Sequence, residues 1–381
     1  MQLFVDGLAI QASRHRVALE LVLVEWNPPA DHPPLREALR WPTGNGFFEP
    51  RIVTVPRAIH ARFDPGGVLP LFQMLAKNAG IRRARGRFVL ATNVDVLFPD
   101  ELLRFLRDDL CEGVLYRNDR LDVLREIPEA LPFDELMEFC RTHVVRRHRA
   151  DGTYVLHGSR WARADPEVES TTWGRVRRWL GRQGEAPVAA AAAATAATLR
   201  GLAGLRGSSE ERSLPGAVWS LQTLADRLAS RRRLRRLHRN GAGDFTLLDR
   251  EAWFRLRGYP EWKMFSWHLD SVLLFQADAS GVAFRTLPES QCTYHVDHGG
   301  GWTPEDQARL FSRLAQRGIR VLSDQELFAL RAEMEEKRRH RESVVHNGED
   351  WGLAGEELPE SQPLAPRLHP PAPGQADPRW L

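Results

Sequence analysis

Residues 77–98, with the sequence KNAGIRRARGRFVLATNVDVLF, constrain the fold of this 381-residue chain more than any other stretch. The pattern predicts a helix that stops at Gly86, a buried strand over Phe88–Ala91, and a polar Asn93-x-Asp95 turn. Because residues i and i+2 of extended backbone point to one face, Asn93 and Asp95 are expected to converge on one ion or ligand. In open α/β sheets, ligands bind beyond the carboxyl ends of the strands, which is where this carboxylate is expected.

Short apolar runs alternate with helical segments over most of the chain. Helices are expected between the predicted strands, which are residues 19–24, 51–55, 88–91, 113–116, 243–248 and 282–287. This alternation favours an α/β fold, built on a mostly parallel sheet with helices on its faces. Two further charged helices are expected within residues 304–343.

Composition excludes several classes of protein. The net charge of +3 is small, so charge alone gives no reason to expect a nucleic-acid partner. Cys111, Cys140 and Cys292 are far apart and odd in number, which indicates reduced, buried thiols and not a disulfide framework or a zinc cluster. No run approaches the roughly 20 apolar residues of a membrane span. No signal peptide is visible, so a cytoplasmic protein is expected.

Two regions depart from the alternating pattern. Residues 160–240 are rich in alanine and arginine, and predict an insertion of helices and disordered loop. Within it, residues 173–180 suggest a short basic amphipathic helix that would allow peripheral contact with an anionic membrane or a lipid-linked acceptor. The tail at 356–381 is rich in proline and polar residues, so it is expected not to fold, and its deletion to leave the melting temperature nearly unchanged.

Taken in order, the motifs resemble those of glycosyltransferases of the GT-A fold, especially the family-two-like and galactosyltransferase-like groups. The resemblance covers about residues 17–125 and 238–303, and it is the order of the motifs, each loose by itself, that is specific. The matching residues are Asn78 and Gly80, Ala84 and Gly86, Phe88–Ala91, Asn93 and Asp95, then Gly243-Asp244-Phe245, His268-Leu269-Asp270, and His295 or His298. It implies a GT-A (Rossmann-like) α/β domain.

The resemblance also implies a UDP- or GDP-linked sugar donor, a carbohydrate or lipid-linked acceptor, and a divalent metal on the donor diphosphate. Asp95 is the expected direct metal ligand, with His295 or His298 as a later imidazole ligand. An imidazole would favour manganese over magnesium. Asn93 departs from the usual first aspartate, and its amide oxygen brings no charge. The alternative for both histidines is that they are ordinary hydrogen-bonded loop residues.

Asp270 is the expected general base, because inverting transfer requires an acceptor hydroxyl that loses its proton as it attacks. The alternative role is a helix cap, since aspartate is favoured there. Lys77, Arg82 and Arg83 are candidates for neutralising phosphates, although arginines on a helix usually face solvent.

Glu25, Asn78, Asn93 and Asp119 are assigned to donor binding, and Asp122 is considered together with Asp119. Glu25 ends the first predicted strand, and in the resembling family an acid there contacts the base or ribose. A solvated turn acid is the alternative. Asn78 and Asn93 match family motifs. Asp119 and Asp122 follow another strand and would position donor sugar or acceptor hydroxyls. Salt bridges from these two acids to Arg117 and Arg120 are the alternative.

The expected organisation is a nucleotide-sugar-binding half at 1–159, the insertion at 160–240, an acceptor and catalytic half at 241–303, helices at 304–355 and the tail. Two rival functions are considered. A sugar-nucleotide pyrophosphorylase would require an N-terminal glycine-rich phosphate loop followed by a basic residue, and none is seen. A degenerate, non-catalytic member would bind partners through its basic insertion.

One expected strand is missing. A GT-A sheet normally begins with a strand before the helix that leads to the strand ending in Glu25. Here Met1 already lies in that predicted helix. A central strand is hydrogen-bonded on both sides, so its loss would expose two ladders. The natural chain is therefore expected to carry about 15–25 more residues, enough for one strand and its loop.

Overall fold

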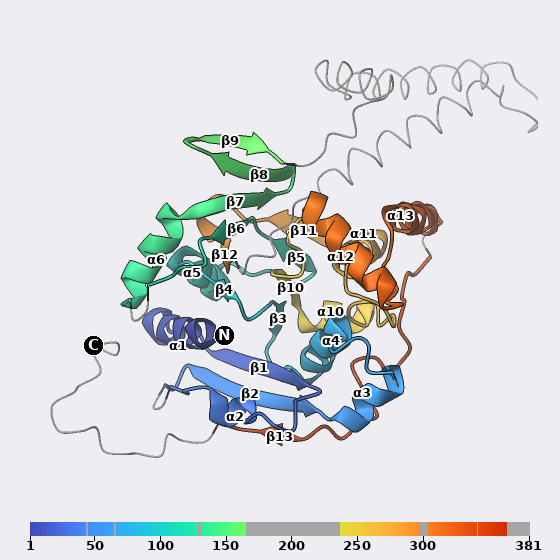
Figure 1. The fold of residues 1–381 in the computed structure, drawn as a ribbon, viewed down its shortest axis with the longest axis horizontal. Coiled ribbons are helices and arrows are strands. Elements are labelled where there is room, and N and C mark those ends of the chain that lie inside the picture. The colour runs from blue at the N-terminus through green and yellow to red at the C-terminus, as the bar shows by residue number, and fades with distance from the viewer. Residues whose placement is uncertain are drawn as a thin grey trace, which may run out of the picture. The chain divides into compact units, whose positions relative to one another are not determined.

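The computed structural model describes residues 1–42, 45–64, 66–128, 131–164, 237–297, 304–340 and 342–363 (Figure 1). The chain divides into two units, one made of Met1–Ala164 and His238–Leu381, the other of Asp165–Leu237. All elements named here belong to the first unit. The basic helix expected at 173–180, and most of the expected insertion, lie outside the described residues.

The described residues of the first unit form helices throughout its length. They are α1 (Gln2–His15), α2 (Leu35–Ala38), α3 (Arg57–Phe63), α4 (Gln73–Arg83), α5 (Asp100–Asp108), α6 (Phe133–Thr142), α10 (Arg250–Leu256), α11 (Leu269–Ala279), α12 (Pro304–Gln316), α13 (Asp324–Arg339) and the 3-10 turn η1 (Glu289–Gln291). Helix α1 packs against α5, α4 packs against the strands β1 (Leu19–Trp26) and β3 (Phe88–Ala91), and α11 packs against α13.

The strands form three sheets. The first has the order β1-β2-β13, the second β11-β5-β10-β3, and the third β4-β12-β6-β7-β8-β9. The bounds of the remaining strands are β2 (Phe48–Val55), β4 (Val96–Leu97), β5 (Val114–Arg117), β6 (Arg120–Val123), β7 (Val144–Arg149), β8 (Gly152–His157), β9 (Arg160–Arg163), β10 (Thr246–Asp249), β11 (Ala283–Thr286), β12 (Thr293–Val296) and β13 (Glu360–Ser361).

The fold is mixed α/β, as the alternating pattern predicts, but its sheets are not mostly parallel. Three of the ten strand pairs formed by described residues are parallel, namely β1 with β2, β5 with β11, and β6 with β12. Strand β10 runs antiparallel to both β3 and β5. Apolar content marks a buried strand in either direction, so the sequence pattern did not reveal this orientation.

Helix α5 shows how the pattern positions the central stretch. Leu102, Leu103 and Phe105 are buried on one face of the helix, and Asp100 and Glu101 carry negative charge in its first turn, where the helix dipole favours it. They join a core that also holds Phe98, whose ring makes edge contacts with Phe4 of α1 and Phe245 before β10. These contacts fix the loop between β3 and α5.

The predicted left-handed stop at Gly86 is wrong. Helix α4 ends at Arg83, its cap residue Ala84 is extended with φ −65° and ψ 139°, and Gly86 is not among the glycines with positive φ. A side chain at Gly86 would instead approach the Phe88 carbonyl oxygen, with its Cβ 3.1 Å away. The glycine therefore provides room beside β3.

The C-terminal segment packs on the body beyond the boundary expected at residue 356. Leu358 is buried, and Glu360–Ser361 pair with β2. Arg83 donates hydrogen bonds to the backbone oxygens of Gly352, Leu353 and Glu356. The composition of the tail hid this, because one buried leucine is enough to anchor a polar segment that also adds a strand.

No helix among the described residues combines the length and apolar character needed to cross a membrane. All three cysteines are free thiols. Cys140 and Cys292 are buried, as expected, but the prediction is wrong for Cys111, which is exposed.

Candidate functional site

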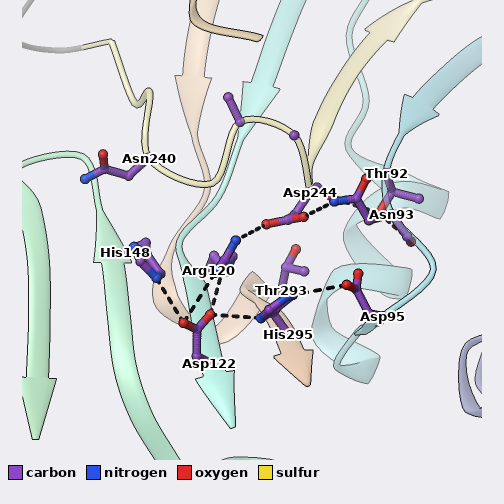
Figure 2. A network of polar contacts seen from close by, with 12 residues as sticks. Thr92, Asn93, Asp95, Arg120, Asp122, His148, Asn240, Asp244, Thr293 and His295 are labelled. Atoms are coloured by element: carbon purple, nitrogen blue, oxygen red, sulfur yellow. Dashed lines mark hydrogen bonds and ion pairs between the residues drawn. The ribbon is translucent and has the colours of Figure 1, made fainter. Parts of the chain in front are cut away.

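The Asn93-x-Asp95 turn lies where β6, β10 and β12 bring polar side chains beside the end of β3 (Figure 2). Register explains the convergence, because β12 pairs with β6 on one side and with β4 on the other. His295 is opposite Asp122 in one pairing and opposite Val96 in the other. Its imidazole therefore falls between Asp122 and Asp95, the residue that precedes Val96.

His295 touches both carboxylates. Its Nδ1 is 3.1 Å from Asp122 Oδ1, and its Nε2 is 3.4 Å from Asp95 Oδ2. Burial opposes the charged imidazolium, but the hydrogen bonds with Asp122 and Asp95 outweigh burial and raise the pKa of His295 to about 9. Without a cation, His295 therefore bridges the two acids in its protonated form at neutral pH.

Asp122 is fully buried at the centre of a cationic group. It accepts hydrogen bonds from Arg120 Nε at 2.7 Å and Arg146 Nη1 at 2.6 Å, and His148 Nε2 lies 3.1 Å away. Burial alone would raise the pKa of Asp122, but the hydrogen bonds from His148 and His295 and the charge of Arg120 hold it well below the usual range. Asp122 is thus a permanent anion at neutral pH.

Asn93 does not point toward the same partners as Asp95. Its Nδ2 donates to Asp244 Oδ1 at 2.6 Å, and its Oδ1 accepts from Gln73 Nε2 at 3.1 Å. Asp244 in turn accepts from Arg120 Nη1 at 2.7 Å, which joins Asn93 to the Asp122 group. Both ends of the Asn93 amide are engaged inside the protein, so its expected part in donor binding stays a prediction.

Asp270 and Lys77 lie on either side of Gly243. A Cβ built on Gly243 would be 3.8 Å from both Asp270 Oδ2 and Lys77 Nζ, and Lys77 donates a hydrogen bond to the Gly243 carbonyl oxygen. Asp270 is the second residue of α11 and accepts from its neighbour's N–H, while the N-cap is His268, so the cap alternative does not describe its position. Glycine at 243 leaves space beside the carboxylate.

Each of these two groups perturbs the other. Burial raises the pKa of Asp270, against the hydrogen bond from Ser271 and the positive charges of Arg117, His268 and Lys77. Burial lowers the pKa of Lys77 to about 8, against the attraction of Asp244, Asp270 and Asp95. A carboxylate with a raised pKa beside a partly neutralised ammonium is typical of functional sites.

Arg82 and Arg83, considered with Lys77 as candidates for binding phosphates, have other partners. Arg82 donates to the Trp351 carbonyl oxygen, and Arg83 donates to three carbonyls of the C-terminal segment. Of the three cations, Lys77 is the one whose pKa responds to the carboxylates of the site.

Substituting Lys77 by Met is expected to stabilise the protein at pH 7 by about 1 kcal/mol. The depressed pKa means that burying the charged ammonium lowers the free energy of unfolding by about 3 kcal/mol. The substitution removes this cost but also loses the hydrogen bond to Gly243, which contributes roughly 2 kcal/mol. The cost is fully present below the folded pKa of about 8 and disappears as pH rises toward the ordinary value of 10.5, so the advantage should shrink and reverse there. Urea unfolding at pH 7 and near pH 10 measures this.

Lys263→Met is the matched control, because Lys263 Nζ also bonds a backbone oxygen, that of Arg62, but on an exposed surface. It should change stability little at either pH. A Lys77→Met protein less stable than the wild type at pH 7 would contradict the assignment of Lys77 as a strained buried cation.

The hydrogen bonds of the other predicted donor-binding residues go elsewhere. Glu25 accepts from the Leu35 N–H at 2.7 Å. Asn78 is fully buried and exchanges hydrogen bonds with the backbone of Tyr259, Nδ2 to O and N to Oδ1, both at 2.8 Å. Asp119 pairs with His238 at 2.8 Å, and not with the arginines expected as its alternative partners. Their roles in donor binding stay predictions, and His298 lies outside the described residues.

A divalent cation fits between Asp95 and His295. Two ligands in neighbouring positions of one octahedral cation are about 3 Å apart at bonds of about 2.1 Å, close to the 3.4 Å between Asp95 Oδ2 and His295 Nε2. Within the described ranges, no group of three or more histidine, cysteine or acidic residues is arranged to hold a metal. A cation held by this pair would need its other ligands from outside these two side chains.

The sequence analysis gave no role to Arg146, His148 or Gln73. A signal for the first two was present. Residues 146 and 148 alternate on one face of β7, and they pair in register with Asp122 and Arg120 of β6. Alternating charged residues on two neighbouring strands indicate a buried ion-pair group, provided that the pairing of the strands is known.

Comparisons with known proteins do not identify the chain. No protein-family model matches it. No curated protein matches it either. The functional proposal therefore rests on the site's own residues and on the order of the motifs.

Proposed function

We propose that this protein is a GT-A-fold glycosyltransferase that moves a sugar from a nucleotide donor to an acceptor hydroxyl, with metal assistance and inversion at the anomeric carbon. The observation that carries the proposal is the Asp95–His295 pair, 3.4 Å apart, with Asp95 directly before β4 and His295 in β12. The resemblance assigns Asp95 and either His295 or His298 to the metal, and Asp95 and His295 come from parts of the chain 200 residues apart. Asp270 and Lys77 lie in the same electrostatic group.

Asp95 and His295 would hold the cation that neutralises the donor diphosphate. Such a cation, when bound, stabilises the negative charge that develops on the leaving nucleoside diphosphate. A mixed oxygen and nitrogen ligand pair favours manganese over magnesium. The ammonium of Lys77 adds positive charge to the same group, and its attraction to Asp95 and Asp270 keeps it there.

Asp270 would take the proton from the acceptor hydroxyl as that oxygen attacks the anomeric carbon. A raised pKa makes a carboxylate a better base near neutral pH, provided it remains ionised. Gly243 places no Cβ beside the carboxylate oxygen Oδ2, where one would lie 3.8 Å away. The first turn of α11 fixes the carboxylate through the Ser271 N–H.

The first alternative function, a sugar-nucleotide pyrophosphorylase, would require an N-terminal glycine-rich phosphate loop, and none is seen in the sequence. The non-catalytic binding protein is the second candidate, and the basic insertion favours it. The two candidates differ in metal-dependent nucleotide binding, which only the enzyme requires.

The test is a thermal-shift and calorimetric panel with UDP, GDP and TDP, each with and without manganese, on the wild type and on Asp95→Ala. One nucleotide is expected to stabilise the wild type strongly only when manganese is present. Asp95→Ala should bind that nucleotide with manganese at least about tenfold more weakly. It should keep its fold, because the Asp95 side chain is partly exposed. Asp108→Ala, which removes an exposed carboxylate of α5, serves as the control.

Two results would contradict the proposal. One is manganese-dependent nucleotide binding that survives in a folded Asp95→Ala protein. The other is a wild type that binds none of the three nucleotides with manganese, which would favour the non-catalytic candidate.

A further inference from the structure

Asp122 lies behind His295 as seen from Asp95. The imidazole presents Nε2 to Asp95 and Nδ1 to Asp122, so the three side chains form a line of carboxylate, imidazole and carboxylate (Figure 2). Asp122 is fully buried, whereas the Asp95 side chain is 34% exposed. The outer carboxylate is thus partly exposed, and the inner one is not.

A histidine that binds a cation through Nε2 must carry its proton on Nδ1, and that proton requires an acceptor. Asp122 Oδ1, 3.1 Å from Nδ1, is placed to be this acceptor. Its own position is fixed by Arg120 Nε at 2.7 Å and Arg146 Nη1 at 2.6 Å, one on each carboxylate oxygen. The carboxylate therefore can neither rotate nor leave without breaking two short ion pairs.

We propose that Asp122 is a positioning residue, which holds the His295 proton on Nδ1 and so turns Nε2 into a ligand for the cation shared with Asp95. This inference rests on the proposed function. It adds that metal affinity depends on a buried strand residue that no motif marks. Mutating the hydrogen-bond partner of a metal-binding histidine typically lowers metal affinity by about 10- to 100-fold.

His148 provides an internal control. It approaches the same carboxylate, with Nε2 3.1 Å from Asp122 Oδ2, and it is equally buried. Its other nitrogen faces Thr153 Oγ1 at 3.2 Å, away from Asp95. If Asp122 only stabilises the fold, disturbing its contact with His148 or with His295 should affect metal affinity equally. If Asp122 positions His295, only its contact with His295 should matter for metal affinity.

The experiment measures manganese affinity directly, by the loss of the free Mn²⁺ electron paramagnetic resonance signal in the presence of UDP or GDP. In Asp122→Asn, the amide oxygen can still accept from an arginine, but its NH₂ group would donate to His295 Nδ1 and drive the ring proton onto Nε2. Affinity should fall by about 10- to 100-fold. His148→Gln should stay within about twofold of the wild type, since it leaves the His295–Asp122 contact in place.

A second variant covers the case in which Asp122→Asn leaves a buried arginine unpaired and fails to fold. Asp122→Asn combined with Arg146→Gln keeps the net charge of the group unchanged, and Arg146→Gln alone is its reference. The double variant should show the same loss of affinity relative to Arg146→Gln.

The outcomes separate this inference from the proposed function. If Asp95→Ala loses manganese and the Asp122 variants keep it, the inference is overturned and the proposed function stands. If Asp122→Asn and His148→Gln lose affinity equally, Asp122 has a structural role and the inference is again overturned. If Asp95→Ala keeps manganese, the proposed metal site itself is wrong, whatever the Asp122 variants do.

Discussion

Asp270→Asn is expected to lower sugar transfer by about 10²- to 10⁴-fold and to leave nucleotide binding nearly unchanged. The substitution keeps the shape of the side chain and its hydrogen bond from the Ser271 N–H, but removes the only function assigned to it, acceptance of a proton. In the proposed function, Asp95 and His295, and not Asp270, would hold the cation on the donor diphosphate. A coupled assay of nucleoside diphosphate release, with calorimetry for donor binding, measures the two effects separately.

The pH profile adds a second check on the same residue. Burial raises the pKa of Asp270, and the ionised form is the base, so transfer should fall as pH is lowered through that raised pKa. Asp324→Asn is the control, since Asp324 bonds His268 next to Asp270 but is itself mostly exposed. Equal losses of donor binding and transfer in Asp270→Asn would contradict the base role.

Local elements could be predicted because each depends on a few neighbouring residues. The strand at Phe88–Ala91 is placed as predicted, and helices α5, α10 and α11 lie between predicted strands, as expected. Strand direction could not be predicted in this way. Strand β10 pairs with β3 from more than 150 residues away, and nothing in TLLD specifies an antiparallel partner.

The residues of the candidate site, too, could be predicted only in part. Motif order pointed to Asp95, His295 and Asp270, and the structure brings the first two together. Motif order also pointed to Asn78, yet this side chain forms hydrogen bonds with the backbone of Tyr259. The neighbouring Gly258 has a left-handed backbone, and a Cβ there would lie only 2.2 Å from Asn78 Oδ1. An asparagine reads identically in sequence whether it serves a ligand or a turn. Burial and partners distinguish the two, and these require the fold.

The largest expected effect on stability concerns the C-terminal segment, and it reverses the expectation drawn from composition. Removing residues 356–381 should lower the free energy of unfolding by about 2–4 kcal/mol relative to removing 364–381 alone. The buried Leu358 accounts for about 2 kcal/mol. The Thr54 N–H to Pro359 hydrogen bond of 2.9 Å and the β13–β2 pairing add roughly 1 kcal/mol each. Comparing the two truncations isolates residues 356–363.

Point variants give the same answer without shortening the chain. Leu358→Ala should cost about 2–3 kcal/mol, because its side chain packs in the cluster of Val53, Val55 and Leu75 beneath β2. Glu357→Ala, one residue earlier and exposed, should change stability by less than about 0.5 kcal/mol. Urea unfolding measures both. Equal stability of the two truncated proteins, together with a harmless Leu358→Ala, would show that β13 contributes nothing to β2. The segment 356–363 also supplies one of the three C-terminal carbonyls that bind Arg83 at the end of α4, that of Glu356, and α4 is the helix that carries Lys77. Shortening the tail would then disturb the site as well as the fold.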